Sequence, residues 1–303
     1  MALGDLYEAT AGETTDLYYV DTGMYDTAEY GSVYILDAER PALVDTGIGT
    51  NYEAILDAMD EVGIAPEDLE VIAPTHVHLD HAGGAGYLAA DCPNADVYVY
   101  ELGARHLVDP ERLWEGTKAA VEDQIAYYAE PKPVPEERIV ELTDGDTVDL
   151  GDHSLDVHHA PGHAPHQVVF HDPANDGVFT ADAAGILTPG LDGPRQTSPP
   201  PTFDLDQVLA DVEMLRDLDP SALYYGHFGD SPTADNLDAY AEVTREWVAD
   251  VEAARERLAD DEAVIEHFVE RTEAVDAWGE EKARAEERMN VRGILTYLDN
   301  RED

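Results

Sequence analysis

The residues of this chain that could do chemistry are most concentrated in the segment Thr75–His81, T-H-V-H-L-D-H. The segment places three imidazoles and one carboxylate in one stretch of backbone, and these groups bind borderline divalent ions such as zinc. Catalytic metal sites are built mainly from His and Asp or Glu and keep a position for water. The segment therefore predicts a hydrolytic metal centre. The alternative, a surface loop that binds metal adventitiously, suits a lone H-x-H better than this four-ligand string.

The element that precedes this segment should position its ligands. Residues 70–75 form a short apolar run that ends at a proline, which is typical of a buried strand. His76 and His78 follow on the loop that leaves the strand, where an extended backbone sends alternate side chains to the same side. We therefore expect this pair to face one metal ion, and Asp80 with His81 to face a second.

The element that follows, residues 82–90, is predicted to be a helix although it contains Gly83, Gly84 and Gly86. Each glycine costs a helix roughly 1 kcal/mol relative to alanine. Their presence indicates that the backbone here runs close to a metal or to a packed strand.

Further candidate ligands lie elsewhere in the chain, as two complete coordination spheres would require. Each follows a short strand-like run, the position at which α/β sheets generally gather ligands. His163 ends the turn A-P-G-H, Asp182 follows G-V-F-T-A, and His227 follows L-Y-Y-G. Asp45, in A-L-V-D-T-G, repeats the pattern of a strand followed by an acid.

With these motifs in this order, the chain resembles the metallo-β-lactamase-fold hydrolase superfamily over roughly residues 31–229. The resemblance implies an α/β protein, an αβ/βα sandwich with two sheets face to face, helices outside and the metals at one edge. It implies these ligand sets: His76, His78 and His163 for the first ion; Asp80, His81 and His227 for the second; Asp182 as the bridging carboxylate.

Asp45 is similar to an acid that orients the ligand loop through a metal-bound imidazole. An acid that merely closes a turn at the strand end is the alternative. Two divalent ions are expected as cofactors, zinc first, with iron and manganese as alternatives.

The ligand set implies a hydrolytic mechanism. Water that bridges two divalent ions loses a proton near neutral pH and becomes a strong nucleophile. Asp80 is the expected catalytic residue, because its carboxylate can hold the attacking hydroxide in line. No G-x-S-x-G motif offers a competing nucleophile, and Cys92, the single cysteine, is expected to be structural or an inert surface thiol.

The composition is strongly acidic, with 67 Asp and Glu against 17 Lys and Arg and a formal net charge of −50. With only three lysines, this composition resembles that of an extreme halophile's cytosolic protein. Molar salt shortens the screening length to about 3 Å, so the repulsion among the acidic side chains becomes tolerable. An acidic mesophilic protein with a basic partner fits less well, because the acid is spread along the chain. We see no signal peptide and no membrane-spanning stretch, and expect a cytoplasmic protein.

Two parts are expected: a metal-hydrolase domain over residues 1–230 and a helical subdomain over residues 231–303 packed on it. A helix is predicted to begin at Ser231–Pro232 and to carry one apolar stripe, with two further helices behind it. The stripe could also carry a homodimer contact.

An insertion at residues 109–130 is predicted to form one or two helices that could cover the site as a lid. Packing in the core is the favoured interpretation of its aromatic residues. Candidate substrate-binding residues are Trp114, Tyr127 and Tyr128 of this insertion, His166 beside the P-G-H turn, and Arg195 in the loop of residues 187–201.

The expected substrate is a small molecule, an ester, thioester or lactone, as in the glyoxalase II and lactonase branches that share the H-x-H-x-D-H string. The lactonase tyrosine is absent after Asp182, and no glutathione-binding signature appears in the tail. A phosphodiesterase or nuclease is the alternative, but so few basic residues leave no cationic track for nucleic acid. A metal-bound sensing protein with little turnover is a second alternative.

Overall fold

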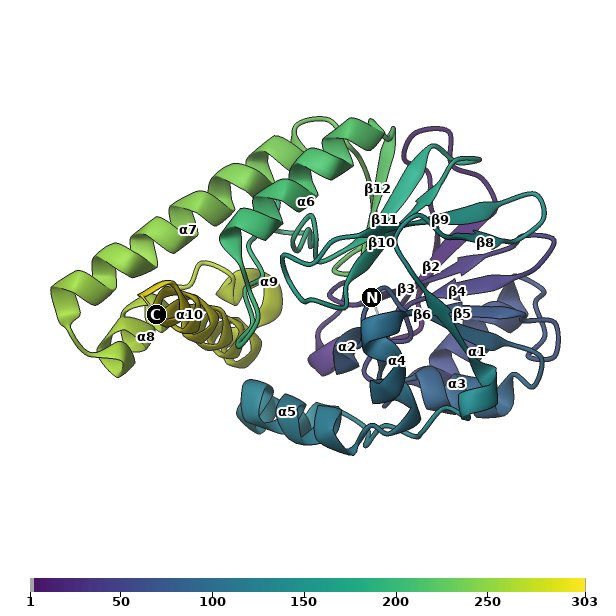
Figure 1. Ribbon diagram of the computed structural model, residues 1–303, viewed down its shortest axis with the longest axis horizontal. Coiled ribbons are helices and arrows are strands. Elements are labelled where there is room, and N and C mark those ends of the chain that lie inside the picture. Colours follow the sequence, from purple (N-terminus) through teal and green to yellow (C-terminus); the bar gives the residue numbers. More distant parts are fainter. Residues whose placement is uncertain (1–2, 303) are drawn as a thin grey trace.

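The computed structural model describes residues 3–302 and contains two β-sheets that face each other (Figure 1). The first sheet has seven strands in chain order: β1 (Leu6–Glu8), β2 (Leu17–Asp21), β3 (Ser32–Leu36), β4 (Ala42–Val44), β5 (Val71–Ala73), β6 (Asp96–Tyr100) and β7 (Ile139–Leu142). The second has the order β13-β12-β11-β10-β9-β8: β8 (Thr147–Asp149), β9 (Ser154–His159), β10 (Val168–Asp172), β11 (Gly177–Ala181), β12 (Ala222–Tyr225) and β13 (Asp230–Pro232).

Helices cover both outer faces of this pair of sheets. In chain order they are α1 (Tyr52–Glu61), α2 (Leu79–Ala82), α3 (Ala85–Asp91), α4 (Glu101–Val108), α5 (Glu111–Val121), α6 (Leu205–Leu218), α7 (Asn236–Leu258), α8 (Asp261–Val269), α9 (Val275–Trp278) and α10 (Glu280–Glu302). Three short 3-10 helices accompany them: η1 (Met24–Asp26), η2 (Glu122–Tyr127) and η3 (Glu136–Arg138).

Three apolar cores hold these layers together. One lies between the sheets and includes Val44, Phe170 and Phe179. A second packs α1, α3 and α4 on the first sheet, and a third packs α6, α7, α8 and α10 on the second. Helix, sheet, sheet and helix therefore follow one another, and the predicted αβ/βα sandwich is confirmed.

The strand directions bring one set of strand ends to a common edge. β4 to β7 are parallel, and parallel neighbours need crossover connections, which α1, the α2–α3 segment and the α4–α5 segment supply. In the second sheet β11 and β12 are parallel, and two antiparallel pairings give β9 the same direction as β11.

The helix predicted over residues 82–90 is wrong in one respect: it is two helices, α2 and α3, separated at Gly83 and Gly84. A Cβ at Gly84 would lie 2.3 Å from the carbonyl oxygen of Thr46, and one at Gly86 would lie 2.0 Å from that of Lys132. The close backbone approach expected of these glycines is present, and it is made to neighbouring loops.

The start predicted for the next helix, at Ser231–Pro232, is also wrong, although the helix itself is present as α7. Residues Asp230–Pro232 extend the second sheet as edge strand β13, where a proline is tolerated because its missing N–H costs no ladder bond. The helix begins at Asn236. Helix α6 was not predicted; it opens on Asp204, whose side chain accepts a hydrogen bond from the backbone N–H of Gln207 at 3.0 Å.

The C-terminal helices pack into the same core as the second sheet. Val251 of α7 and Ile294 of α10 share that core with Val178 of β11 and Leu223 of β12. The proposed boundary at residue 230 falls inside β13, so the division into two parts stays a prediction. Among residues 3–302, no helix combines the length and the apolarity needed to cross a bilayer.

Candidate metal centre

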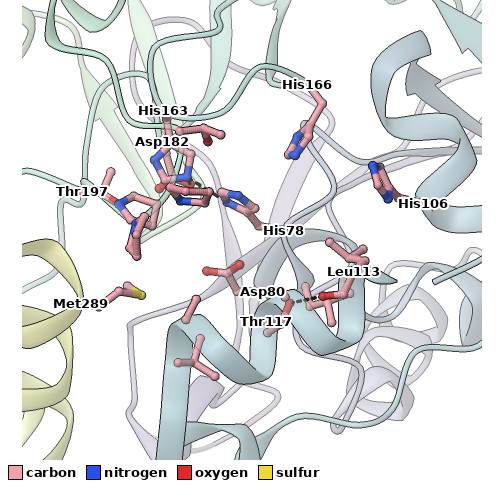
Figure 2. A pocket seen from close by; sticks show the side chains of 18 of the residues that line it. His78, Asp80, His106, Leu113, Thr117, His163, His166, Asp182, Thr197 and Met289 are labelled. Atoms are coloured by element: carbon pink, nitrogen blue, oxygen red, sulfur yellow. Dashed lines mark hydrogen bonds and ion pairs between the residues drawn. The ribbon is translucent and has the colours of Figure 1, made fainter. Parts of the chain in front are cut away.

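All seven predicted ligands lie at the edge where the two sets of strands end. Figure 2 labels four of them, His78, Asp80, His163 and Asp182. His76 and His78 follow β5 on an irregular loop, and His78 immediately precedes α2, which carries Asp80 and His81. In the second sheet, His163 follows β9, Asp182 follows β11 directly, and His227 follows β12.

The imidazoles of the first predicted set converge on one point. His76 Nε2 lies 3.1 Å from His78 Nδ1, and His78 Nδ1 lies 3.0 Å from His163 Nε2. Two nitrogens that each bind a tetrahedral zinc ion at about 2.0–2.1 Å lie about 3.3 Å apart. The observed spacings are close to this value, so the three nitrogens could hold one ion.

Asp182 connects the two predicted sets. Its Oδ2 lies 3.3 Å from His163 Nε2 and 3.2 Å from His81 Nε2, and its Oδ1 lies 3.7 Å from His227 Nε2. The second set, Asp80 with His81 and His227, has its ligand atoms within 4.8 Å of one another. A carboxylate between two clusters is the arrangement that bridges a pair of cations.

Buried polar atoms without partners provide the test of whether a cation fits. His81 Nε2 and Asp182 Oδ1 are buried and have no hydrogen-bond partner within the described structure. Leaving such groups unsatisfied is costly, and each occurrence needs an explanation. A divalent cation would satisfy both atoms at once, so the donor set fits the metal that the sequence predicts.

The protonation states of His78, His163 and Asp182 suit metal binding. Burial, and next the charge of His163, lower the pKa of His78 to about 4, while burial lowers the pKa of His163. Burial raises the pKa of Asp182, but His163 and His81 outweigh it and hold that pKa below the ordinary value. Neutral imidazoles beside an ionised carboxylate are the forms that coordinate a cation.

Asp45 contacts the ligand loop at two points. Its Oδ2 lies 2.8 Å from His81 Nδ1, and its Oδ1 accepts hydrogen bonds of 2.8 Å from both the backbone N–H and the hydroxyl of Thr75. Burial lowers the pKa of His81, but Asp45 and Asp182 raise it well above the ordinary value. A hydrogen bond to Nδ1 leaves Nε2 facing the cluster, which is the orienting contact that the sequence suggested.

His227 is oriented by a residue that the sequence analysis did not identify. Its Nδ1 donates to the backbone carbonyl of Tyr30 at 3.1 Å, and the two rings lie 5.0 Å apart between centroids. A backbone contact of this kind leaves no side-chain signature, so no motif could have indicated it.

A cavity of about 400 Å³ opens beside the cluster, and His78, Asp80, His163, Asp182 and His227 form part of its wall (Figure 2). Most of the remaining lining is apolar or aromatic. Helix α5, the proline-rich loop and helix α10 contribute Leu113, Ala120, Val121, Pro199, Pro200, Pro201 and Met289, and η1 with three loop segments contributes Tyr25, Tyr30, Tyr128 and Ile186.

The predicted substrate-binding residues divide between this cavity and the core. Tyr128 and His166 line the cavity, and the ring centroid of His166 lies 5.3 Å from that of His78. Trp114 and Tyr127 are not among the lining residues and pack in an apolar cluster that also includes Tyr25 and Trp278. Arg195 pairs with Glu287 at 3.4 Å, away from the lining.

The insertion between β6 and β7 contributes a wall of the cavity through α5, although whether it opens and closes as a lid stays a prediction. Cys92 is fully buried, and burial raises the pKa of its thiol to about 11, as expected of a structural residue.

A two-sheet sandwich with a His and Asp cluster at its edge defines a metal-binding hydrolase class. The family model of the Metallo-beta-lactamase superfamily matches residues 26–227, and the chain belongs to this superfamily. The superfamily consists generally of metal-dependent hydrolases, and the chain shares its metal-binding fold.

Two relatives are similar over different lengths. The metallo-beta-lactamase fold-containing protein ST1585 of Sulfurisphaera tokodaii is 24% identical over 218 residues, which are 70% of this chain and 78% of that protein. The acyl-coenzyme A thioesterase MBLAC2 of Gallus gallus is 26% identical over 185 residues, which are 55% of this chain. The chain spans 62% of the length of that thioesterase.

Solved structures agree on the fold. The crystal structure of ST1585 matches with a TM-score of 0.70 at 21% identity, covering 93% of this chain and 99% of that one. A B3 metallo-beta-lactamase with an active-site glutamic acid matches with a TM-score of 0.58 at 22% identity, covering 80% and 88%. At these sequence identities the structural matches show a shared fold and nothing more.

Proposed function

We propose that the chain is a dinuclear metal-dependent hydrolase of a small ester, thioester or lactone, and that an acyl thioester is its substrate. The observation that carries the proposal is the apolar cavity of about 400 Å³ that opens directly onto the His and Asp cluster. An apolar wall of this kind suits an acyl chain. The similarity to an acyl-coenzyme A thioesterase favours the thioester among the three bonds.

In this proposal the two ligand sets hold one divalent ion each, zinc first, with iron and manganese as alternatives. Their members are His76, His78 and His163, then Asp80, His81 and His227, with Asp182 between them. When bound, such ions polarise the substrate carbonyl and lower the pKa of water.

Asp80 is the proposed catalytic residue. Its side chain is 25% exposed and lies on the cavity wall, with Oδ2 3.8 Å from His227 Nε2. Burial raises the pKa of Asp80, but His81 and His227 lower it below the ordinary value, so the carboxylate is ionised. An ionised carboxylate at this position can accept a hydrogen bond from water in the cavity and orient it toward the substrate.

The alternatives have less support. A nuclease or phosphodiesterase acting on nucleic acid needs a cationic track, whereas this chain has a net charge of −50. A sensing protein with little turnover does not require a carboxylate exposed to the cavity in the way that Asp80 is. A homodimer through the C-terminal helices stays a proposal.

We also propose a cytosol of high salt as the setting, without membrane attachment. The charge of −50 supports it, because molar salt screens the self-repulsion. A single buried cysteine without a disulfide is consistent with a reducing compartment.

A pH-stat assay of proton release tests the function. Metal-reconstituted protein in molar KCl is given a thioester, a lactone, a β-lactam and a phosphodiester, each with a chelator control. Chelator-sensitive cleavage of the thioester supports the proposal, and cleavage of the phosphodiester alone contradicts it. Asp80→Asn should lower kcat by about 10²-fold or more at equal metal content, the scale of a lost general-base contact. Full activity of that variant would remove Asp80 from the mechanism.

A further inference from the structure

Three basic residues lie together on the wall of the cavity that contains the metal centre. Arg105 and His106 come from α4 and Arg112 from α5, and all three line the same cavity as Asp80. Figure 2 shows His106 on the far side of His166 from the His and Asp cluster. In a chain with 17 basic residues against 67 acidic ones, this concentration at one site calls for an explanation.

Within residues 3–302, the guanidinium groups of Arg105 and Arg112 have no carboxylate partner. Among the ion pairs of the described side chains, none includes Arg105 or Arg112, whereas Arg138, Arg216 and Arg288 each pair with an acid. Arg105 donates instead to His106, from Nε to Nε2 at 3.3 Å. Arg245, Arg257 and Arg271 also lack an ion pair among the described side chains, so it is the position of Arg105 and Arg112 on the cavity wall that indicates a ligand as their partner.

The local potential agrees with this geometry. Burial lowers the pKa of His106, and the positive charges of Arg105 and then Arg112 lower it further. Both guanidiniums therefore act on the same point of the wall. An anion placed there would be stabilised by both charges and could accept hydrogen bonds from two planar donor groups.

The rest of the lining has the contrasting chemistry. Leu113, Val121, Ile186 and Met289 are apolar and line the cavity on the side of α5, the loop after β11 and α10. A substrate that fills the cavity would thus present an apolar portion to these residues and an anionic portion to the three basic ones.

We infer that Arg105, His106 and Arg112 form a subsite for a phosphate group carried on the thiol side of an acyl thioester. The inference rests on the proposed function and names its substrate class. A phosphate is favoured over a carboxylate because its three terminal oxygens can meet two guanidiniums and an imidazole at once. The acyl portion then occupies the apolar wall.

The test compares two thioesters with the same butyryl group, one of coenzyme A and one of N-acetylcysteamine, which lacks phosphate. The variant is Arg105→Gln/Arg112→Gln. The matched control is Arg245→Gln/Arg257→Gln, which removes the same charge from exposed positions of α7 that do not line the cavity. Each lost charge-assisted contact should cost about tenfold, so kcat/KM for the coenzyme A ester should fall about 100-fold in the double variant. The neutral thioester and the control variant should change by less than about twofold.

Equal losses for both thioesters, or no loss for either, would overturn the inference. A selective loss for glutaryl-N-acetylcysteamine, whose carboxylate is on the acyl side, would also overturn it. Calorimetric binding of adenosine 3′,5′-bisphosphate gives a readout that does not depend on turnover. If the wild-type protein cleaves no thioester, the proposed function fails, and the binding difference between the variants still decides the subsite.

Discussion

Tyr30 and Glu286 are joined by a hydrogen bond of 3.1 Å from the tyrosine hydroxyl to the carboxylate, across 256 positions of sequence. The backbone carbonyl of the same tyrosine accepts from His227 Nδ1. Helix α10 therefore contacts the metal centre through one intermediate residue. Glu286 also receives hydrogen bonds from Lys282 at 2.6 Å and from Asn290 at 3.0 Å, and all of these side chains are buried.

The buried Lys282–Glu286 ion pair should contribute strongly to stability. Glu286→Gln leaves the Lys282 ammonium buried without a counter-charge, which should lower the free energy of unfolding by about 3 kcal/mol or more. Chemical denaturation measures this loss of stability. The double variant Lys282→Met/Glu286→Gln should recover a large part of the lost free energy of unfolding. Glu280→Gln, which breaks the exposed pair with Arg284 on the same helix, is the control and should cost under about 1 kcal/mol. Similar losses in the two single variants would contradict the assignment.

The sequence predicted which side chains converge at the sheet edge far better than it predicted what supports them. Segment Thr75–His81 and the three distant ligands each follow a strand, and strand ends meet at a sheet edge for topological reasons that a sequence can reveal. The contribution of Glu286 could not be predicted, because its helix is polar over much of its length and the contact to Tyr30 is non-local.

The errors have similar physical causes. Ser231–Pro232 satisfies the local rule for a helix start, but pairing with β12 outweighs it. Trp114 packs with an apolar cluster, in agreement with the favoured interpretation of aromatic residues at helical spacing, and its role in substrate binding stays a prediction. Local patterns define which residues are apolar, but not which neighbour covers them.

Asp45 should control the affinity of the second ligand set for metal. Asp45→Asn removes the charge that faces His81 Nδ1 at 2.8 Å, so metal affinity should fall by about 10- to 100-fold. Competition with a chromogenic chelator measures the change. Asp37→Asn, at an exposed position just after β3, is the matched control. If the metal affinity of Asp45→Asn is unchanged, Asp45 does not orient the ligand loop and only closes the turn at the strand end.

Metal removal should destabilise the protein. Only the folded chain gathers the seven ligands, so an ion at 100 times its dissociation constant adds about 2.7 kcal/mol to the free energy of unfolding. Thermal unfolding with and without a chelator should show a Tm that rises with free metal concentration. His163→Ala should weaken this dependence, whereas His267→Ala, at a distant surface position, should preserve it. A Tm independent of metal in the wild-type protein would contradict the assignment.

Asp211 should give the protein a pH-dependent stability. Burial raises the pKa of this carboxyl to about 7 from 3.8, although the backbone N–H of Gly162 donates to it at 2.7 Å. At pH values between these two pKa values, Asp211 keeps its proton in the native state and has lost it in the unfolded state. The free energy of unfolding therefore falls as pH rises from about 4 to about 7, and it is level above that.

Asp211→Asn keeps an acceptor for Gly162 and removes this titration. Relative to wild type, the variant should gain stability across the same pH window, by up to about 4 kcal/mol for a shift of about three pKa units. Urea denaturation at a series of pH values measures the difference. Asp206→Asn removes one exposed charge from the same helix and serves as control. A constant difference between Asp211→Asn and wild type would show that Asp211 is ionised throughout.

The acidic surface should make stability depend on salt, and helix α1 offers a local test. Glu53, Asp57 and Glu61 are exposed at i, i+4 and i+8, and no ion pair of the described side chains includes them. Asp57→Lys should replace two repulsive pairs with two attractive ones and raise the free energy of unfolding by about 1 kcal/mol at low salt. Between about 0.1 M and about 1 M KCl the screening length falls from about 10 Å to about 3 Å, so most of this gain should vanish. Asp57→Ala is the control that separates the loss of repulsion from the gain of attraction. If the gain in the free energy of unfolding persists at about 1 M KCl, where the screening length is about 3 Å, the effect belongs to helix propensity and not to charge.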